Sequence, residues 1–113
     1  MKMKTLEDLL PKLIKSTEDK KLTWIVSSTG FECHIGNQDV KTWAWFDEGS
    51  ETNFVTVQLR AGPDFNPTIL DSVTAGDFES NYNIVSSLHS AARRSAHNVD
   101  AIIENISDKL DKL

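Results

Sequence analysis

The sequence predicts an α+β fold: an N-terminal helix, an antiparallel β-meander of four to five strands and a long C-terminal helix. Three patterns lead to this prediction. Apolar residues near the N-terminus recur with the period of a helix, those in the middle of the chain alternate as in a strand, and those of the last third recur every seven residues. At 113 residues, the chain is expected to form one domain over residues 1–113.

The first helix is predicted to begin between residues 5 and 8 and to end near residue 19. Its apolar residues follow the i, i+3, i+4, i+7, i+8 spacing of an amphipathic helix: Leu6, Leu9, Leu10, Leu13 and Ile14. Thr5 and Asp8 have the spacing of a capping box, which would start the helix. Pro11 would remove a hydrogen bond inside such a helix, so a start at Asp8, with Pro11 in the first turn, remains an alternative.

Strands are predicted where β-branched and aromatic residues alternate with polar ones. The expected ranges are residues 22–27, 31–36, 39–46 and 53–60, with residues 68–73 as a candidate fifth strand. The connections SSTG, GNQD and DEGSET are rich in turn-forming residues. They are too short for parallel crossovers, so the sheet should be an antiparallel meander.

The C-terminal helix is predicted over residues 77–111, a range without Gly or Pro. Apolar residues recur along it every seven positions: Phe78, Val85, Ala92, Val99, Ile106 and Leu113. A helix of about 30 residues would be about 45 Å long, whereas a compact domain of this size has a radius of gyration of roughly 13 Å. Either the helix breaks, or it overhangs its own sheet and needs another surface to cover it; we favour the overhang.

Two surfaces are predicted to mediate contacts with a second copy or with a protein partner. On the helix, small residues would let a neighbouring element come close. On the sheet, Trp43 and Trp45 share one face while Val40 and Phe46 share the other, so two helices packed on one face would leave apolar side chains bare. The alternative is that each helix covers a different face. The predicted interface residues are Trp43, Trp45, Phe54, Leu88, Ala92, Ser95, Ala96 and Val99.

These surfaces favour a non-enzymatic interaction protein, a homodimer that acts as an adaptor or an inhibitor. The alternative is a small-molecule or nucleotide-binding module whose site lies between chains. In that case Trp43 or Trp45 would stack on a flat ring, and Arg93, Arg94 and His97 would contact its phosphates.

Catalytic residues, metal ligands and cofactors are not expected. Cys33 and His34 are neighbours, but adjacent side chains of a strand point to opposite faces, so they do not form a nucleophile–base pair. His89 and His97 are eight residues apart, about 12 Å along a helix, and cannot share a metal ion within one chain. The sequence contains no GxSxG, HExxH, P-loop or GxGxxG motif.

Charge and hydropathy argue against nucleic acid and membrane as partners. The net charge is −5, and residues 22–76 carry two basic against seven acidic residues, whereas nucleic-acid binders usually present a basic face. No apolar run approaches the roughly 18–20 residues needed to cross a bilayer, and the charged N-terminus lacks the apolar core of a signal peptide. With Cys33 as the single cysteine, a cytoplasmic location is expected.

Two segments carry a resemblance to known proteins. The tryptophan-containing first strand, LTWIV, is followed by the meander and by a helix that reads L-x-x-x-A-R-R-x-A-x-x-V-D from Leu88 to Asp100. This layout resembles one that recurs among small uncharacterised bacterial and phage proteins. The resemblance covers the whole chain and implies the architecture; it implies no shared chemistry.

Overall fold

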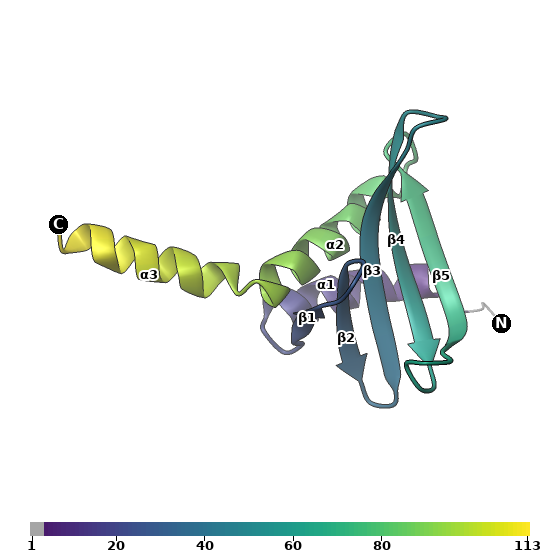
Figure 1. Cartoon of the computed structure of the whole chain (residues 1–113), viewed down its shortest axis with the longest axis horizontal. Helices are drawn as coiled ribbons and strands as arrows, with labels where there is room; N and C mark the ends of the chain where they lie inside the picture. Colours follow the sequence, from purple (N-terminus) through teal and green to yellow (C-terminus); the bar gives the residue numbers. More distant parts are fainter. Residues whose placement is uncertain (1–3) are drawn as a thin grey trace.

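The computed structural model describes residues 4–113 and confirms the predicted α+β class (Figure 1). The elements in chain order are α1 (Leu6–Glu18), β1 (Trp24–Val26), β2 (Phe31–Ile35), β3 (Gln38–Asp47), β4 (Thr52–Ala61), β5 (Thr68–Gly76), α2 (Tyr82–Ala96) and α3 (Val99–Asp111). The five strands form one antiparallel sheet in the order β1-β2-β3-β4-β5. The sheet is therefore the predicted meander, and the candidate fifth strand is part of it.

Helix α1 begins with the capping box that the sequence suggests. The Asp8 backbone N–H donates to Thr5 Oγ1, and the Thr5 backbone N–H donates to Asp8 Oδ2, each over 3.2 Å. Pro11 consequently lies inside the helix, where its missing N–H removes the bond to the carbonyl of Glu7. Both residues lie on the exposed side of the helix, where water can reach that carbonyl.

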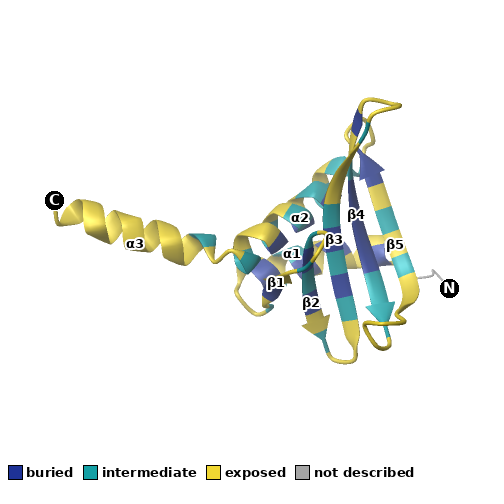
Figure 2. Cartoon of the chain, viewed as in Figure 1, coloured by how far each residue is buried: buried dark blue, intermediate teal, exposed yellow. Residues whose placement is uncertain are grey.

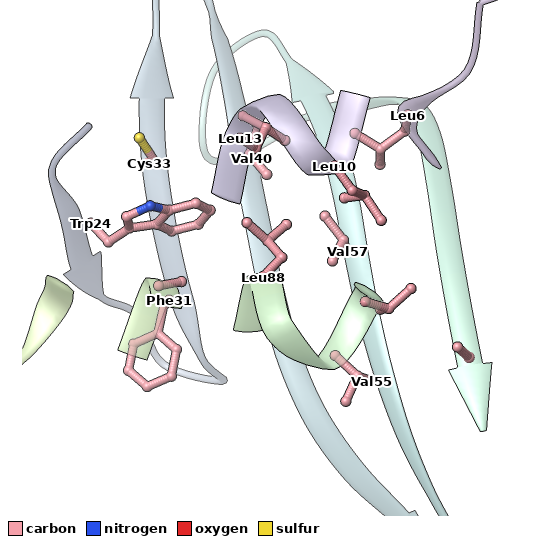
Figure 3. Close-up of a cluster of buried hydrophobic side chains, with 13 residues drawn as sticks. Leu6, Leu10, Leu13, Trp24, Phe31, Cys33, Val40, Val55, Val57 and Leu88 are labelled. Carbon is pink, nitrogen blue, oxygen red and sulfur yellow. The ribbon is translucent and has the colours of Figure 1, made fainter. Parts of the chain in front are cut away.

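Both α1 and α2 pack on the same face of the sheet, and the core lies between this helical layer and the strands (Figures 1 and 3). The buried apolar residues are Leu6, Leu10, Leu13, Trp24, Phe31, Cys33, Val40, Val55, Val57, Ala75, Val85, Leu88 and Ala92. Within residues 4–113, no helix covers the other face of the sheet (Figure 1). The alternative with one helix on each face is therefore not the observed arrangement.

The predicted C-terminal helix is broken in two. Asn98 takes the left-handed conformation, with φ 52° and ψ 45°, which asparagine tolerates better than most residues with a side chain. The N–H groups of His97 and Asn98 donate to Arg93 and Ser95 carbonyls over 3.1 Å and end α2. The N–H of Ile102 donates to the Asn98 carbonyl over 3.2 Å and starts α3.

The C-terminal segment also overhangs the domain, as the sequence suggests. Helix α3 projects from the end of α2, away from the sheet (Figure 1). The molecule measures 56 × 36 × 33 Å with a radius of gyration of 15.9 Å, larger than the roughly 13 Å of a compact domain of this length. Both expected outcomes, a break and an overhang, therefore occur together.

The segment before α2 differs from the prediction. The helix was expected from about residue 77, but residues 77–81 form turns in which the Asp77 N–H donates to the Asn53 carbonyl and the Glu79 N–H to the Gly76 carbonyl, each over 2.9 Å. Phe78 therefore does not lie on the buried seam of the helix and is 72% exposed. Its ring lies over Gly76 on the uncovered face of the sheet, where a Cβ at Gly76 would come within 2.7 Å of Phe78 Cε1.

Candidate functional site

The uncovered sheet face carries four aromatic residues at one end, which we call the aromatic face: Trp43, Trp45, Phe54 and Phe78. The rings of Trp45 and Phe54, which are register partners, stack with centroids 4.5 Å apart and an angle of 17° between planes. Trp45 Nε1 donates to Thr56 Oγ1 over 3.1 Å. These contacts hold the Trp45 ring in place while 42% of the residue stays exposed.

The other end of the same face is charged. Its residues come from β2, β3 and β4: Glu32, His34, Asp39, Lys41 and Arg60. The His34 Nδ1 contacts the Asp39 carboxylate, and this hydrogen bond raises the pKa of His34 above its ordinary value. The uncovered face therefore has an aromatic end and a charged end, and protein interfaces likewise combine apolar with polar surface.

The interface residues predicted on the helix are divided between the core and the surface. Leu88 and Ala92 have no exposed surface, because the sheet of the same chain covers them. They belong to the core and offer nothing for a partner to contact. Ser95, Ala96 and Val99 are half-buried, and Ser95 Oγ accepts a hydrogen bond of 3.4 Å from the Trp24 backbone N–H.

Helix α3 presents an apolar stripe to solvent along its whole length. The exposed apolar residues are Ile102 (51%), Ile103 (54%), Ile106 (51%), Leu110 (61%) and Leu113 (99%). None of the residues of α3 is buried (Figure 2). The first four lie at the i, i+1, i+4, i+8 spacing of one helix face, and Glu104 and Asp108 lie on the opposite side. We call residues 99–113 the arm.

The predicted interface residues include only Val99 from the arm. The seven-residue spacing of Val99, Ile106 and Leu113, together with the expected overhang, is a signal that could have placed the rest of the stripe in the predicted interface. Phe78 was missed for a different reason, because its position on the aromatic face depends on where α2 begins.

A groove of about 1540 Å³ runs between α1 and α2 on the outer side of the helical layer. Residues of α1, α2 and the α1–β1 connection line it, among them Ile14, Leu22, Ile84, Ser87, Ala91 and Ser95. Val99 and Asp100, the first residues of the arm, lie at one end of the groove. The groove is thus an open channel lined by both apolar and polar side chains, next to the point where the arm leaves the domain.

Comparisons of the chain with models of protein families, with curated proteins and with solved structures found no match. The function is therefore inferred from the geometry of these surfaces.

The residues of the alternative ligand site do not converge within one chain. Trp43 and Trp45 lie on the uncovered face of the sheet, whereas the basic residues lie at the end of α2, in the helical layer on the other face. Arg94 Nη2 donates to Asp100 Oδ1 over 2.7 Å, and the ring of His97 packs against Phe31 with centroids 5.6 Å apart. The sheet separates the aromatic group from the basic group.

Cys33 and His34, which are neighbours in β2, lie in different environments. Cys33 is buried and burial raises the pKa of its thiol, which suppresses the reactive thiolate. His34 points to the opposite, exposed face. In the part of the chain that the structure describes, no group of three or more His, Cys, Asp or Glu side chains could hold a metal ion. Among residues 4–113, no helix is both long and apolar enough to cross a membrane.

His89 is the titratable group most affected by packing in the helical layer. Its Nδ1 lies 3.0 Å from Thr42 Oγ1 of β3, and its ring lies 5.4 Å from that of Phe31 between centroids. Burial lowers the pKa of His89 below its ordinary value, and the charge of Arg93 lowers it further. The folded protein therefore favours the neutral imidazole, which bridges α2 and the sheet.

We expect His89 to make the folded state less stable in mild acid. The unfolded chain protonates this histidine near its ordinary pKa of about 6.5, while the folded chain does so only at lower pH. The unfolded state binds more protons in between, so the stabilisation present above about pH 6.5 is lost as the pH falls through the folded pKa.

Urea denaturation at pH 7.5 and pH 5.5 measures this effect. The wild-type protein should lose more of its free energy of unfolding than the variant His89→Gln, which does not titrate. His34, whose pKa is raised, changes the free energy of unfolding in the opposite direction as the pH falls. It is present in both proteins, so its effect cancels in the comparison. Equal losses would show that His89 does not carry the pH dependence.

Proposed function

We propose that this protein is a non-enzymatic interaction protein that forms a homodimer through its C-terminal arm. It presents the aromatic face to a protein partner, as an adaptor or an inhibitor, in the cytoplasm. The observation that carries this proposal is the apolar stripe of α3, which is exposed over its full length (Figure 2). Contiguous exposed apolar surface of this kind usually marks a contact with another molecule.

The energetics of the arm favour a symmetric dimer. Fully burying an exposed Ile or Leu side chain contributes roughly 1.5–3 kcal/mol, so each half-exposed residue of the stripe contributes about 1 kcal/mol. One arm would thus contribute on the order of 5 kcal/mol, at the low end of the roughly 4–15 kcal/mol that association costs. A two-fold axis makes each chain bury its arm, which doubles the contribution.

The aromatic face has the properties of a site for a different protein. Trp and Phe are enriched at the centres of protein interfaces, and Trp45 is already fixed by Phe54 and Thr56. A side chain that is held before binding loses little conformational entropy when the partner arrives. The charged residues at the other end of the face, among them Glu32, Lys41 and Arg60, would border this contact.

The variant Ile106→Glu tests the role of the arm in self-association. Ile106 lies in the middle of the stripe and is 51% exposed, so a glutamate there is solvated in the monomer but desolvated in the dimer. We expect the dimer to dissociate at least tenfold more readily than the wild type. Sedimentation equilibrium over a range of concentrations would measure the dissociation constant.

Ala101→Glu is the matched control, because Ala101 lies on the polar side of the same helix and is exposed. It adds the same charge and should leave the dimer intact. The helical content of both variants, measured by circular dichroism, should match that of the wild type. A wild-type chain that remains monomeric at tens of micromolar, or a dimer indifferent to Ile106→Glu, would refute the proposal.

A further inference from the structure

The arm is too short to pair stably with another arm alone. Residues 99–113 span about two heptads, whereas coiled coils are recognised by three to four or more. A helix of 13 residues is also marginal by itself in water, since isolated helices shorter than about 12–15 residues gain too little from propagation to offset nucleation. The arm therefore needs a surface that is already folded.

The groove between α1 and α2 matches the arm in length and offers apolar side chains to its stripe. The 15 residues of α2 and the 13 residues of α3 both correspond to about 20 Å of helix. Ile14, Leu22 and Ile84 supply apolar walls. Ser87 and Ala91 are small groove residues of α2, and small side chains at a helix contact let the two axes approach closely.

The geometry of the link argues against occupation of the groove by the arm of the same chain. Only His97 and Asn98 separate α2 from α3. Their backbone groups are hydrogen-bonded to Arg93, Ser95 and Ile102, and these bonds direct α3 away from the domain (Figure 1). Folding the arm back over α2 would break them. The arm leaves from the end of the groove, where Val99 and Asp100 lie, so an arm from a second copy can enter there.

We propose that the groove between α1 and α2 receives α3 of a second copy, so that two chains exchange arms around a two-fold axis. This inference rests on the proposed homodimer and names its binding site. The apolar stripe around Ile103 and Ile106 packs against Ile14, Ile84 and Ala91 of the partner. Each arm then covers a groove, so the stripe of the arm and the apolar walls of the groove are buried together, and the aromatic face stays open.

Disulfide trapping tests the exchange. In a Cys33→Ala background, one chain carries Ile106→Cys in the arm, and a second carries Ser87→Cys or Ala91→Cys in the groove. The two are mixed, allowed to exchange subunits and oxidised mildly; a disulfide forms only where Cα atoms come within about 4.4–6.8 Å. We expect a covalent dimer from the mixture with at least one groove position. Ser72→Cys, exposed on β5, replaces the groove cysteine in the control and should give none.

Four results would overturn the inference. Efficient cross-linking of the Ile106→Cys chain to itself would show that the arms pair with each other. A fast-migrating monomer from one chain carrying both cysteines, without covalent dimer in the mixture, would show that the arm folds back. If sedimentation shows a dimer but neither groove cysteine forms a disulfide with the arm, the dimer contact lies elsewhere. The proposed function would then still stand. A monomeric Cys33→Ala parent, with a monomeric wild type, would instead refute the homodimer, and the exchange with it.

Discussion

Replacing Ala92 by glutamate is expected to unfold the protein under conditions in which the wild type is folded. Ala92 is fully buried between α2 and the sheet. A carboxylate placed there loses its hydration without gaining a partner, which costs several kcal/mol, and the larger side chain adds about 1–3 kcal/mol of overpacking. Together these terms rival the roughly 5–15 kcal/mol that stabilises a domain of this size.

Far-UV circular dichroism and urea denaturation at 25 °C would measure the effect. Ser90→Glu is the matched control, because Ser90 is an exposed residue two positions earlier in α2; it should change the free energy of unfolding by less than about 0.5 kcal/mol. If Ala92→Glu instead abolished a dimer and left a folded monomer, Ala92 would be an interface residue and its placement in the core would be wrong.

Replacing Trp24 by alanine is expected to lower the free energy of unfolding by about 3–5 kcal/mol. Trp24 is only 2% exposed. Its Nε1 donates to Thr17 Oγ1 over 2.9 Å, and the Thr17 hydroxyl donates to the Leu13 carbonyl over 2.7 Å. The indole thus ties β1, an edge strand of 3 residues, to α1 by packing and by hydrogen bonds. Figure 3 shows the indole among the buried side chains of the core.

Urea denaturation of Trp24→Ala and Thr17→Val would separate these two contributions. Thr17→Val conserves the volume but leaves the indole N–H unpaired in the core, at a cost of about 1–3 kcal/mol. Trp45→Ala, on the uncovered face, should cost clearly less than Trp24→Ala because Trp45 is 42% exposed. If Trp45→Ala lowered the free energy of unfolding as much as Trp24→Ala, the uncovered face would be as important to folding as the core.

Local patterns predict most of the secondary structure. The spacing of leucines and the pairing of Thr5 with Asp8 predict α1 and its cap, since both depend only on residues within one or two turns. Alternation predicts β2, β3 and β4 within one residue at each end, because the period of a strand is a property of neighbouring residues. It also predicts that Cys33 is buried and that Trp43 and Trp45 lie on the opposite face from Val40.

Local sequence patterns did not predict the break at Asn98 or the start of α2. Asparagine in a helix is less favourable than alanine by no more than about 0.7 kcal/mol, too little to predict a break. At the other end, Asp77 is drawn out of the helix by the hydrogen bond of its N–H to Asn53 of β4, a residue distant in sequence. Phe78 moves with it from the expected helix seam to the aromatic face.

Which apolar residues lie in the core and which lie on the surface likewise became clear only from the tertiary structure. A periodic stripe says that one side of a helix avoids water, but not which surface covers it. Leu88 and Ala92 continue into Ile102 and Ile106 in one seven-residue pattern, yet the first two face the sheet of the same chain and the last two face solvent. The turn at Asn98 directs α3 away from the sheet, so its apolar residues remain exposed. The spacing of apolar residues does not predict the direction in which a helix leaves the domain, and burial depends on that direction.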